Sequence, residues 1–128
     1  MSENISNLAR YVFLLSFIAK LIFGLWYFLF PESWSALTGW PTETAAGRLL
    51  GAAILVLAVG AIMAYRASSW EQVELYVTME IVWNILGTIG MLWNYATMTL
   101  PLAGWVNTGL LALFLLLYLY IYYNAKQT

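Results

Sequence analysis

A long run without a single charged side chain extends from Ile81 to Ala125. Of the 128 residues in the whole chain, 63% are hydrophobic and only 9% are charged. About a quarter of the residues in a soluble domain are charged, and so few charged groups cannot cover a surface that faces water. The composition therefore indicates an integral membrane protein. It excludes a soluble domain, a disordered chain and a nucleic-acid-binding protein, which needs a basic surface.

Four segments are long and apolar enough to cross a bilayer, whose core of about 30 Å requires roughly 20 residues of helix. The first ends at Pro31, and the residues from Glu32 to Thr44 are expected to form a short interfacial loop. The uncharged run is too long for one span and is expected to turn back at residues 97–101. The sequence therefore predicts a single all-α domain, residues 1–128, folded as an antiparallel up-and-down bundle of four transmembrane helices, near 8–30, 45–66, 70–95 and 101–123.

An even number of spans places both chain ends on one side of the membrane. Basic residues favour that side, because Arg10, Arg66 and Lys126 are expected there, against Arg48 alone near the other side. The positive-inside rule therefore predicts that both termini are cytoplasmic. Aromatic residues, which gather at membrane interfaces, agree with these boundaries. The ones expected at the outer face are Trp26, Trp34, Trp40, Trp93 and Trp105, and those expected at the inner face are Trp70, Tyr118, Tyr120, Tyr122 and Tyr123.

Several polar side chains fall at a similar depth, since a helix rises about 1.5 Å per residue. This predicted polar layer consists of Lys20, Glu80, Asn84, Asn107 and Thr108. An unpaired charge at the bilayer centre costs on the order of 2.5–3.5 kcal/mol, so Lys20 is expected to pair with Glu80. Asn84 and Asn107 are expected to hydrogen-bond the donors and acceptors that remain.

Arg48 is a rival partner for Glu80, but it lies near the outer surface, where its long side chain can reach water. The ion pair itself has two interpretations, which the sequence leaves open. It can fix which helices pack together, or it can belong to a ligand or proton site. Trp83 and Tyr27 are candidates to wall a pocket beside the polar layer. The glycine pairs Gly47–Gly51 and Gly87–Gly90 are expected to let helices approach closely.

The chain contains no cysteine and no histidine. This excludes disulfides, thiol nucleophiles and cysteine-held iron–sulfur clusters. It also excludes a Ser-His-Asp triad and the usual zinc sites. The sequence shows no cluster of metal ligands, so we expect no metal and no catalytic residues, and a protein that is not an enzyme.

Three short motifs in the first half of the chain resemble a known family. They are Phe30-Pro31-Glu32, Gly39-Trp40-Pro41 and Ala46-Gly47-Arg48-Leu49-Leu50-Gly51-Ala52. Together they resemble small four-helix prokaryotic membrane proteins of the DoxX-like type. The resemblance implies a four-helix bundle in a prokaryotic plasma (inner) membrane. Because some of these proteins are associated with quinone-linked redox systems as membrane subunits, it also implies an accessory role.

Three functions fit these expectations. The first, which we expect, is a non-catalytic accessory or structural subunit whose partners in the lipid bilayer are other membrane-protein chains or further copies of itself. The second is a bundle that binds a lipid or quinone, with Lys20, Glu80 and Asn84 orienting the polar end of the ligand. Apart from such a bound lipid or quinone, we expect no cofactor. The third is a small dimeric proton-coupled transporter that uses Glu80. The lack of an internal repeat counts against this last function.

Overall fold

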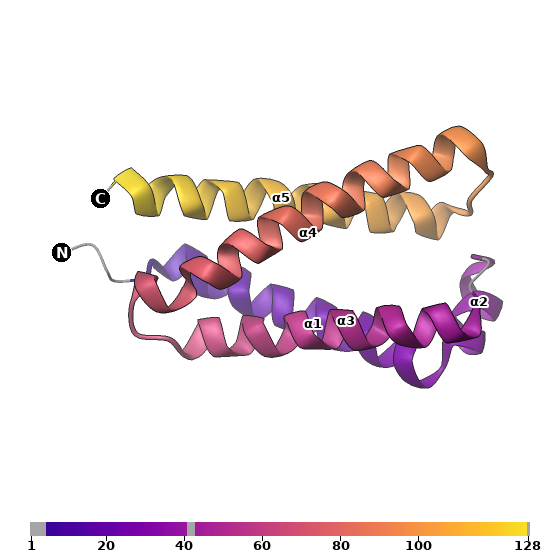
Figure 1. The fold of residues 1–128 in the computed structure, drawn as a ribbon, viewed down its shortest axis with the longest axis horizontal. Helices are drawn as coiled ribbons and strands as arrows, with labels where there is room; N and C mark the ends of the chain where they lie inside the picture. The colour runs from indigo at the N-terminus through magenta and orange to yellow at the C-terminus, as the bar shows by residue number, and fades with distance from the viewer. Residues whose placement is uncertain (1–4, 41–42, 128) are drawn as a thin grey trace.

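The computed structural model describes residues 5–40 and 43–127. The helices in this part of the chain are α1 (Asn7–Leu29), α2 (Pro31–Thr38), α3 (Thr44–Arg66), α4 (Trp70–Thr97) and α5 (Leu102–Gln127). All except the short α2 are long and apolar enough to cross a membrane. They pack as an up-and-down bundle with both chain ends at the same end of the molecule (Figure 1). The predicted all-α bundle with four spans is therefore confirmed, and the chain is a small multi-pass membrane protein.

The two ends of the bundle differ, and we call them the terminal end, which holds both chain termini, and the α2 end (Figure 1). That the terminal end faces the cytoplasm stays a prediction from the basic residues. One of these residues, Lys126, has a side chain that lies outside the part of the structure described.

The segment after α1 is helical over residues 31–38, so the predicted interfacial loop is wrong for these residues. Pro31 lies in the first turn, where its missing N–H costs no hydrogen bond. Gly39 ends the helix with a φ of 74°, a left-handed conformation that favours glycine. Trp34 fixes α2 to the bundle because its buried ring packs against Trp26 and Tyr27, with ring centroids 5.1 and 4.9 Å apart.

Helices α1 and α3 form the most closely packed pair. Gly51 of α3 is buried against the backbone of α1, and a Cβ atom there would lie 2.5 Å from the backbone nitrogen of Phe28 and 2.8 Å from the carbonyl oxygen of Gly24. Gly47, one turn earlier, is also buried. The predicted close approach of helices is therefore confirmed at Gly51, where any side chain would push α1 and α3 apart.

Two arginines join the ends of this pair. Arg10, in the first turn of α1, donates from Nη1 to the carbonyl oxygen of Tyr65 near the end of α3, at 2.7 Å. Arg48, near the start of α3, donates from Nη1 to the carbonyl oxygen of Phe28 near the end of α1, at 3.1 Å. Each positive side chain therefore satisfies a carbonyl group at the negative end of the other helix.

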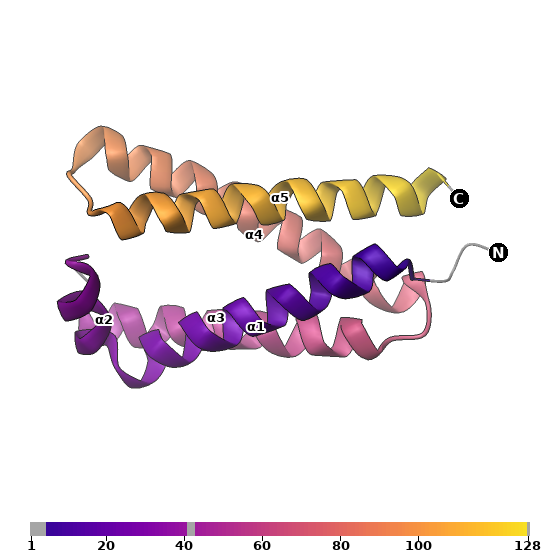
Figure 2. The same ribbon diagram turned by 180° about the vertical axis from the view of Figure 1, so that it is seen from behind.

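Helices α4 and α5 form a second pair, and α4 runs obliquely between the two pairs. Its first turns lie beside α1 and α3 at the terminal end, and its last turns lie with α5 at the α2 end (Figures 1 and 2). Buried apolar side chains from all four long helices fill the terminal end. This core contains Phe13 of α1, Ala64 of α3, Val77 of α4 and Ile121 of α5. The helix pairs are therefore packed together near the termini and diverge toward α2.

Candidate functional site

Lys20 of α1 and Glu80 of α4 form a buried ion pair in which Nζ lies 3.2 Å from Oε1. The side chain of Lys20 is 9% exposed and that of Glu80 is fully buried. The predicted pairing is thus confirmed. Arg48 is not the partner of Glu80, because its guanidinium group is exposed and bonds the end of α1.

Both carboxylate oxygens of Glu80 accept hydrogen bonds. Oε1 accepts from Lys20 and from Nδ2 of Asn84, which lies 3.2 Å away, and Oε2 accepts from the hydroxyl group of Tyr76. Nδ2 of Asn84 also donates to the backbone oxygen of Glu80 at 2.6 Å. Both oxygens of the Glu80 side chain therefore have partners inside the bundle. The predicted role of Asn84 beside the pair is confirmed.

Three side chains that the sequence argument missed extend this network. Ser16 accepts a hydrogen bond from Nζ of Lys20 at 3.2 Å and lies 3.5 Å from the hydroxyl oxygen of Tyr76. The hydroxyl oxygen of Tyr118 lies 3.2 Å from that of Tyr76. Because the hydroxyl group of Tyr76 donates its hydrogen bond to Glu80, its oxygen is left to accept in both contacts. Ser16 and Tyr76 lie one helical turn before the two charged residues, a spacing that places them on the same helix face.

Tyr118 corrects a prediction. It was expected among the aromatic residues at the inner membrane interface, but its side chain is completely buried. The ring lies in the core between the helix pairs, where the hydroxyl group finds a partner in Tyr76. Hydropathy could not reveal this, because tyrosine suits both an interface and a buried position with a hydrogen-bond partner.

The other two members of the predicted polar layer do not bond the ion pair. Thr108 donates to the carbonyl oxygen of Gly104 in its own helix, at 2.9 Å. The side chain of Asn107 makes no hydrogen bond within residues 5–40 and 43–127, so its predicted bond to the pair is wrong. The ring facing Lys20 is Phe114, whose centroid lies 5.4 Å from Nζ. Asn107 lies seven residues before it, or about 10 Å along α5.

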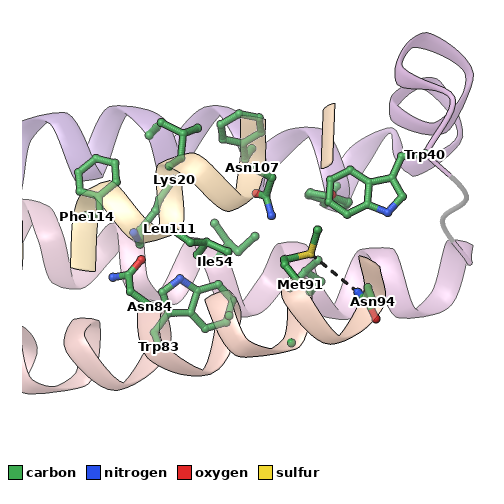
Figure 3. A pocket seen from close by; sticks show the side chains of 17 residues that line it. Lys20, Trp40, Ile54, Trp83, Asn84, Met91, Asn94, Asn107, Leu111 and Phe114 are labelled. Atoms are coloured by element: carbon green, nitrogen blue, oxygen red, sulfur yellow. Dashed lines mark hydrogen bonds between the residues drawn. The ribbon is translucent and has the colours of Figure 1, made fainter. Parts of the chain in front are cut away.

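A cavity of about 350 Å³ lies between the two helix pairs, where they diverge. Side chains of α1, α4 and α5 converge on it (Figure 3). Its wall is mostly apolar and aromatic and includes Trp83 and Tyr27, the two residues expected to wall a pocket. The polar residues in the wall are Lys20, Asn84, Asn94 and Asn107.

The cavity starts at the ion pair and runs toward the α2 end. Its lining extends along α1 from Ala19 to Tyr27, eight residues or about 12 Å, and it reaches Trp40 just beyond α2. The apolar core at the terminal end closes the other direction. Glu80 is fully buried and is not part of the cavity wall. Only the positive member of the ion pair therefore faces the cavity.

Gly90 helps to make this space. A Cβ atom at Gly90 would meet no atom within 4 Å, whereas one at Gly87 would lie 3.1 Å from the side chain of Leu111. Both glycines line the cavity. The expectation that the pair brings helices close together is therefore wrong at Gly90, where the missing side chain leaves open volume.

In the part of the chain that the structure describes, no group of three or more acidic, histidine or cysteine side chains is placed to hold a metal ion. Comparison of the chain with protein-family models, with curated proteins and with solved structures finds no match. The case for a function therefore depends on the cavity and its walls.

Proposed function

We propose that this multi-pass membrane protein binds an apolar molecule with a polar end group, a lipid or a quinone, in the cavity between its helix pairs. We further propose that it does not catalyse a reaction. The observation that carries the proposal is the cavity itself, which has a volume of about 350 Å³ and an apolar wall with a few converging polar groups. Binding sites for small molecules have this size and this composition.

The size of the cavity supports a bound molecule. Protein interiors are closely packed and tolerate few voids larger than a water molecule. An apolar cavity of about 150 Å³ is already large enough to take up benzene, and this one has more than twice that volume. The molecules that a membrane offers to occupy this cavity are apolar.

The polar groups in the wall support a molecule that also has a polar end. Asn107 faces the cavity without a hydrogen-bond partner among the described residues, and an amide group removed from water without a partner is costly. Lys20 and Asn84 lie at the deep end of the same cavity. A ligand with its polar end in the bundle would give these groups partners that hydrocarbon chains alone cannot supply.

Native mass spectrometry after gentle solubilisation from the host membrane tests the proposal. The wild-type protein should retain a discrete bound mass, and a Gly90→Leu variant should lose it, because the new side chain extends into the open volume. A Gly109→Leu variant is the matched control, since Gly109 is exposed on α5 and a Cβ atom there also meets nothing within 4 Å. Equal retention by the two variants, or no bound mass in the wild type, would contradict the proposal.

The role of accessory subunit stays a prediction, as do the prokaryotic inner membrane and the resemblance to DoxX-like proteins. A subunit of this kind can also bind a lipid or quinone, so the two functions are compatible. The same spectra test the subunit role, which predicts recovery within a larger assembly and no free population. Transport by Glu80 has less support, because Glu80 is sealed from the cavity and the terminal end is closed by the core.

A further inference from the structure

We infer that the ligand presents a neutral hydrogen-bond acceptor, a carbonyl oxygen of a ketone, quinone or ester, to Lys20 at the deep end of the cavity. The inference rests on the proposed function and names the chemistry of the ligand that the site selects. The features that carry it are the hydrogen bonds of Lys20 and Asn84 and the position of Glu80 behind the cavity wall.

Among the described residues that line the cavity, Lys20 is the charged hydrogen-bond donor. An ammonium group has three N–H donors, and the contacts of Nζ with oxygen atoms in the described residues are with Ser16 and Glu80. One N–H is therefore left without an oxygen partner, and both Lys20 and Phe114, whose ring centroid lies 5.4 Å from Nζ, line the cavity. The amide nitrogen of Asn84 already donates to Glu80 twice. An acceptor on the ligand therefore finds its partner in Lys20.

The charges around the site favour a neutral acceptor. The ammonium group of Lys20 is already balanced by the carboxylate of Glu80, 3.2 Å away. Among the residues that the structure describes, no other charged side chain lines the cavity. Arg10 of α1 and Arg48 of α3 bond backbone carbonyls at the ends of the neighbouring helices. A carboxylate or phosphate bound at Lys20 would thus add an unbalanced negative charge close to Glu80, which a low-dielectric site disfavours.

The shape of the cavity sets the direction of the ligand. The polar end lies deep, because Lys20 and Asn84 are at the closed end of the cavity. From there the wall continues past Ile54, Leu111 and Met91 toward α2. The apolar part of the ligand therefore extends along this wall, with its far end near Trp40.

Two matched probes test the inference on the full chain in phosphatidylcholine nanodiscs. They are 12-bromododecan-2-one and 12-bromododecanoate, which share a brominated chain and differ in the polar end. Bromine quenches the fluorescence of nearby tryptophan, and Trp40 and Trp83 line the cavity. Quenching that persists in Gly90→Leu measures probe in the surrounding lipid and is subtracted. We expect the ketone to bind at least about tenfold more tightly than the carboxylate.

The infrared band of a ¹³C-labelled ketone gives a direct signature of the hydrogen bond. In the wild type, the carbonyl band of the bound ketone should move to lower frequency than in lipid, because Lys20 donates to it. The double variant Lys20→Met/Glu80→Gln removes both charges while keeping the size of the side chains. It should lose the shift and the preference between the probes.

The outcomes separate the inference from the proposed function. If neither probe gives quenching that depends on Gly90, the proposed function fails. If the carboxylate binds as tightly as the ketone, or if the carbonyl band of the bound ketone is unshifted in the wild type, the proposed function stands and the inference is overturned. Two further probes, a bromoalkyl benzoquinone and the methyl ester of the brominated acid, distinguish the source of the carbonyl. Tighter binding than the carboxylate by either supports the inference.

Discussion

Breaking the Lys20–Glu80 pair from one side should cost far more stability than removing both charges together. At 3.2 Å, two unit charges attract by about 5 kcal/mol at an effective dielectric constant of 20. Lys20→Met leaves the carboxylate without its cation, and Glu80→Gln leaves the ammonium without its anion. Each single variant should therefore lose about 3–5 kcal/mol of unfolding free energy.

The double variant Lys20→Met/Glu80→Gln leaves no uncompensated charge. Its glutamine side chain can still accept a hydrogen bond from Tyr76, because the amide keeps one carbonyl oxygen. The double variant should lose less stability than either single variant. The coupling energy of the cycle is then at least about 3 kcal/mol, at the upper end of the range for residues in one network.

Reversible unfolding in mixed micelles of a mild detergent and sodium dodecyl sulfate, followed by tryptophan fluorescence, measures all four free energies. Glu71→Gln is the matched control, because it removes an exposed carboxylate from the first turn of the same helix and should change stability by less than about 1 kcal/mol. If the two single losses add up to the loss in the double variant, the ion pair does not stabilise the bundle in the way described.

Two other predictions rest on the packing of glycines, and a third rests on the distribution of basic residues. Gly51→Ala should destabilise the bundle by about 1–3 kcal/mol, since its Cβ atom meets the backbone of α1. The control is Gly109→Ala, whose Cβ atom lies in open space, and it should be neutral or slightly stabilising in the same unfolding assay. Gly60→Ala should also lower the free energy of unfolding by about 1–3 kcal/mol. Its Cβ atom would lie 2.6 Å from Cδ1 of Tyr76 and push the tyrosine hydroxyl group away from the ion pair. Stability like that of the wild type would contradict the network. For the membrane orientation, a cysteine replacing Ala36 of α2 should react with an impermeant maleimide in intact cells, and labelling only after permeabilisation would reverse the assignment.

Composition and charge predicted most of the fold. The expected spans near 8–30, 45–66 and 70–95 differ from α1, α3 and α4 by no more than two residues at either end, because long apolar runs have few alternatives to a transmembrane helix. The Lys20–Glu80 pair was predictable for a related reason. A chain with so few charged residues offers each buried charge few partners, and an unpaired charge in the membrane is costly.

Features that depend on rotation and tilt were not predictable in the same way. Depth along a helix predicts that Asn107 lies level with Lys20, whereas in the structure, where α4 runs obliquely (Figure 1), the ring of α5 that faces Lys20 is Phe114. Depth also carries no information about Tyr118, whose direction toward Tyr76 is set by the packing of α5. The cavity has a similar origin, because its volume arises from the divergence of two helix pairs, which hydropathy does not encode.

The short helix α2 was missed for a local reason. Pro31 predicts the end of the first span and the residues after it a loop, yet proline at the start and glycine just after the end, as at Pro31 and Gly39, are also the usual boundaries of a helix. What favours the helix in this chain is Trp34, which buries its ring in the aromatic cluster at the α2 end. That stabilisation comes from tertiary contacts and not from the segment itself.

Photo-crosslinking from inside the cavity shows whether the cavity holds a ligand. Met91 lines the cavity and is 8% exposed, whereas Met63 on α3 is 66% exposed and faces outward. Two variants are made, one with Met91 and one with Met63 as its single methionine besides the initiator. Leucine replaces the other internal methionines, a change that cores tolerate. Each variant is grown with photo-methionine, which is similar in size to methionine. We predict that Met91 forms one discrete adduct, with a molecule that has a neutral carbonyl group. Met63 should instead form adducts with a mixture of bulk phospholipids. The same phospholipid mixture at both positions would contradict a ligand site in the cavity.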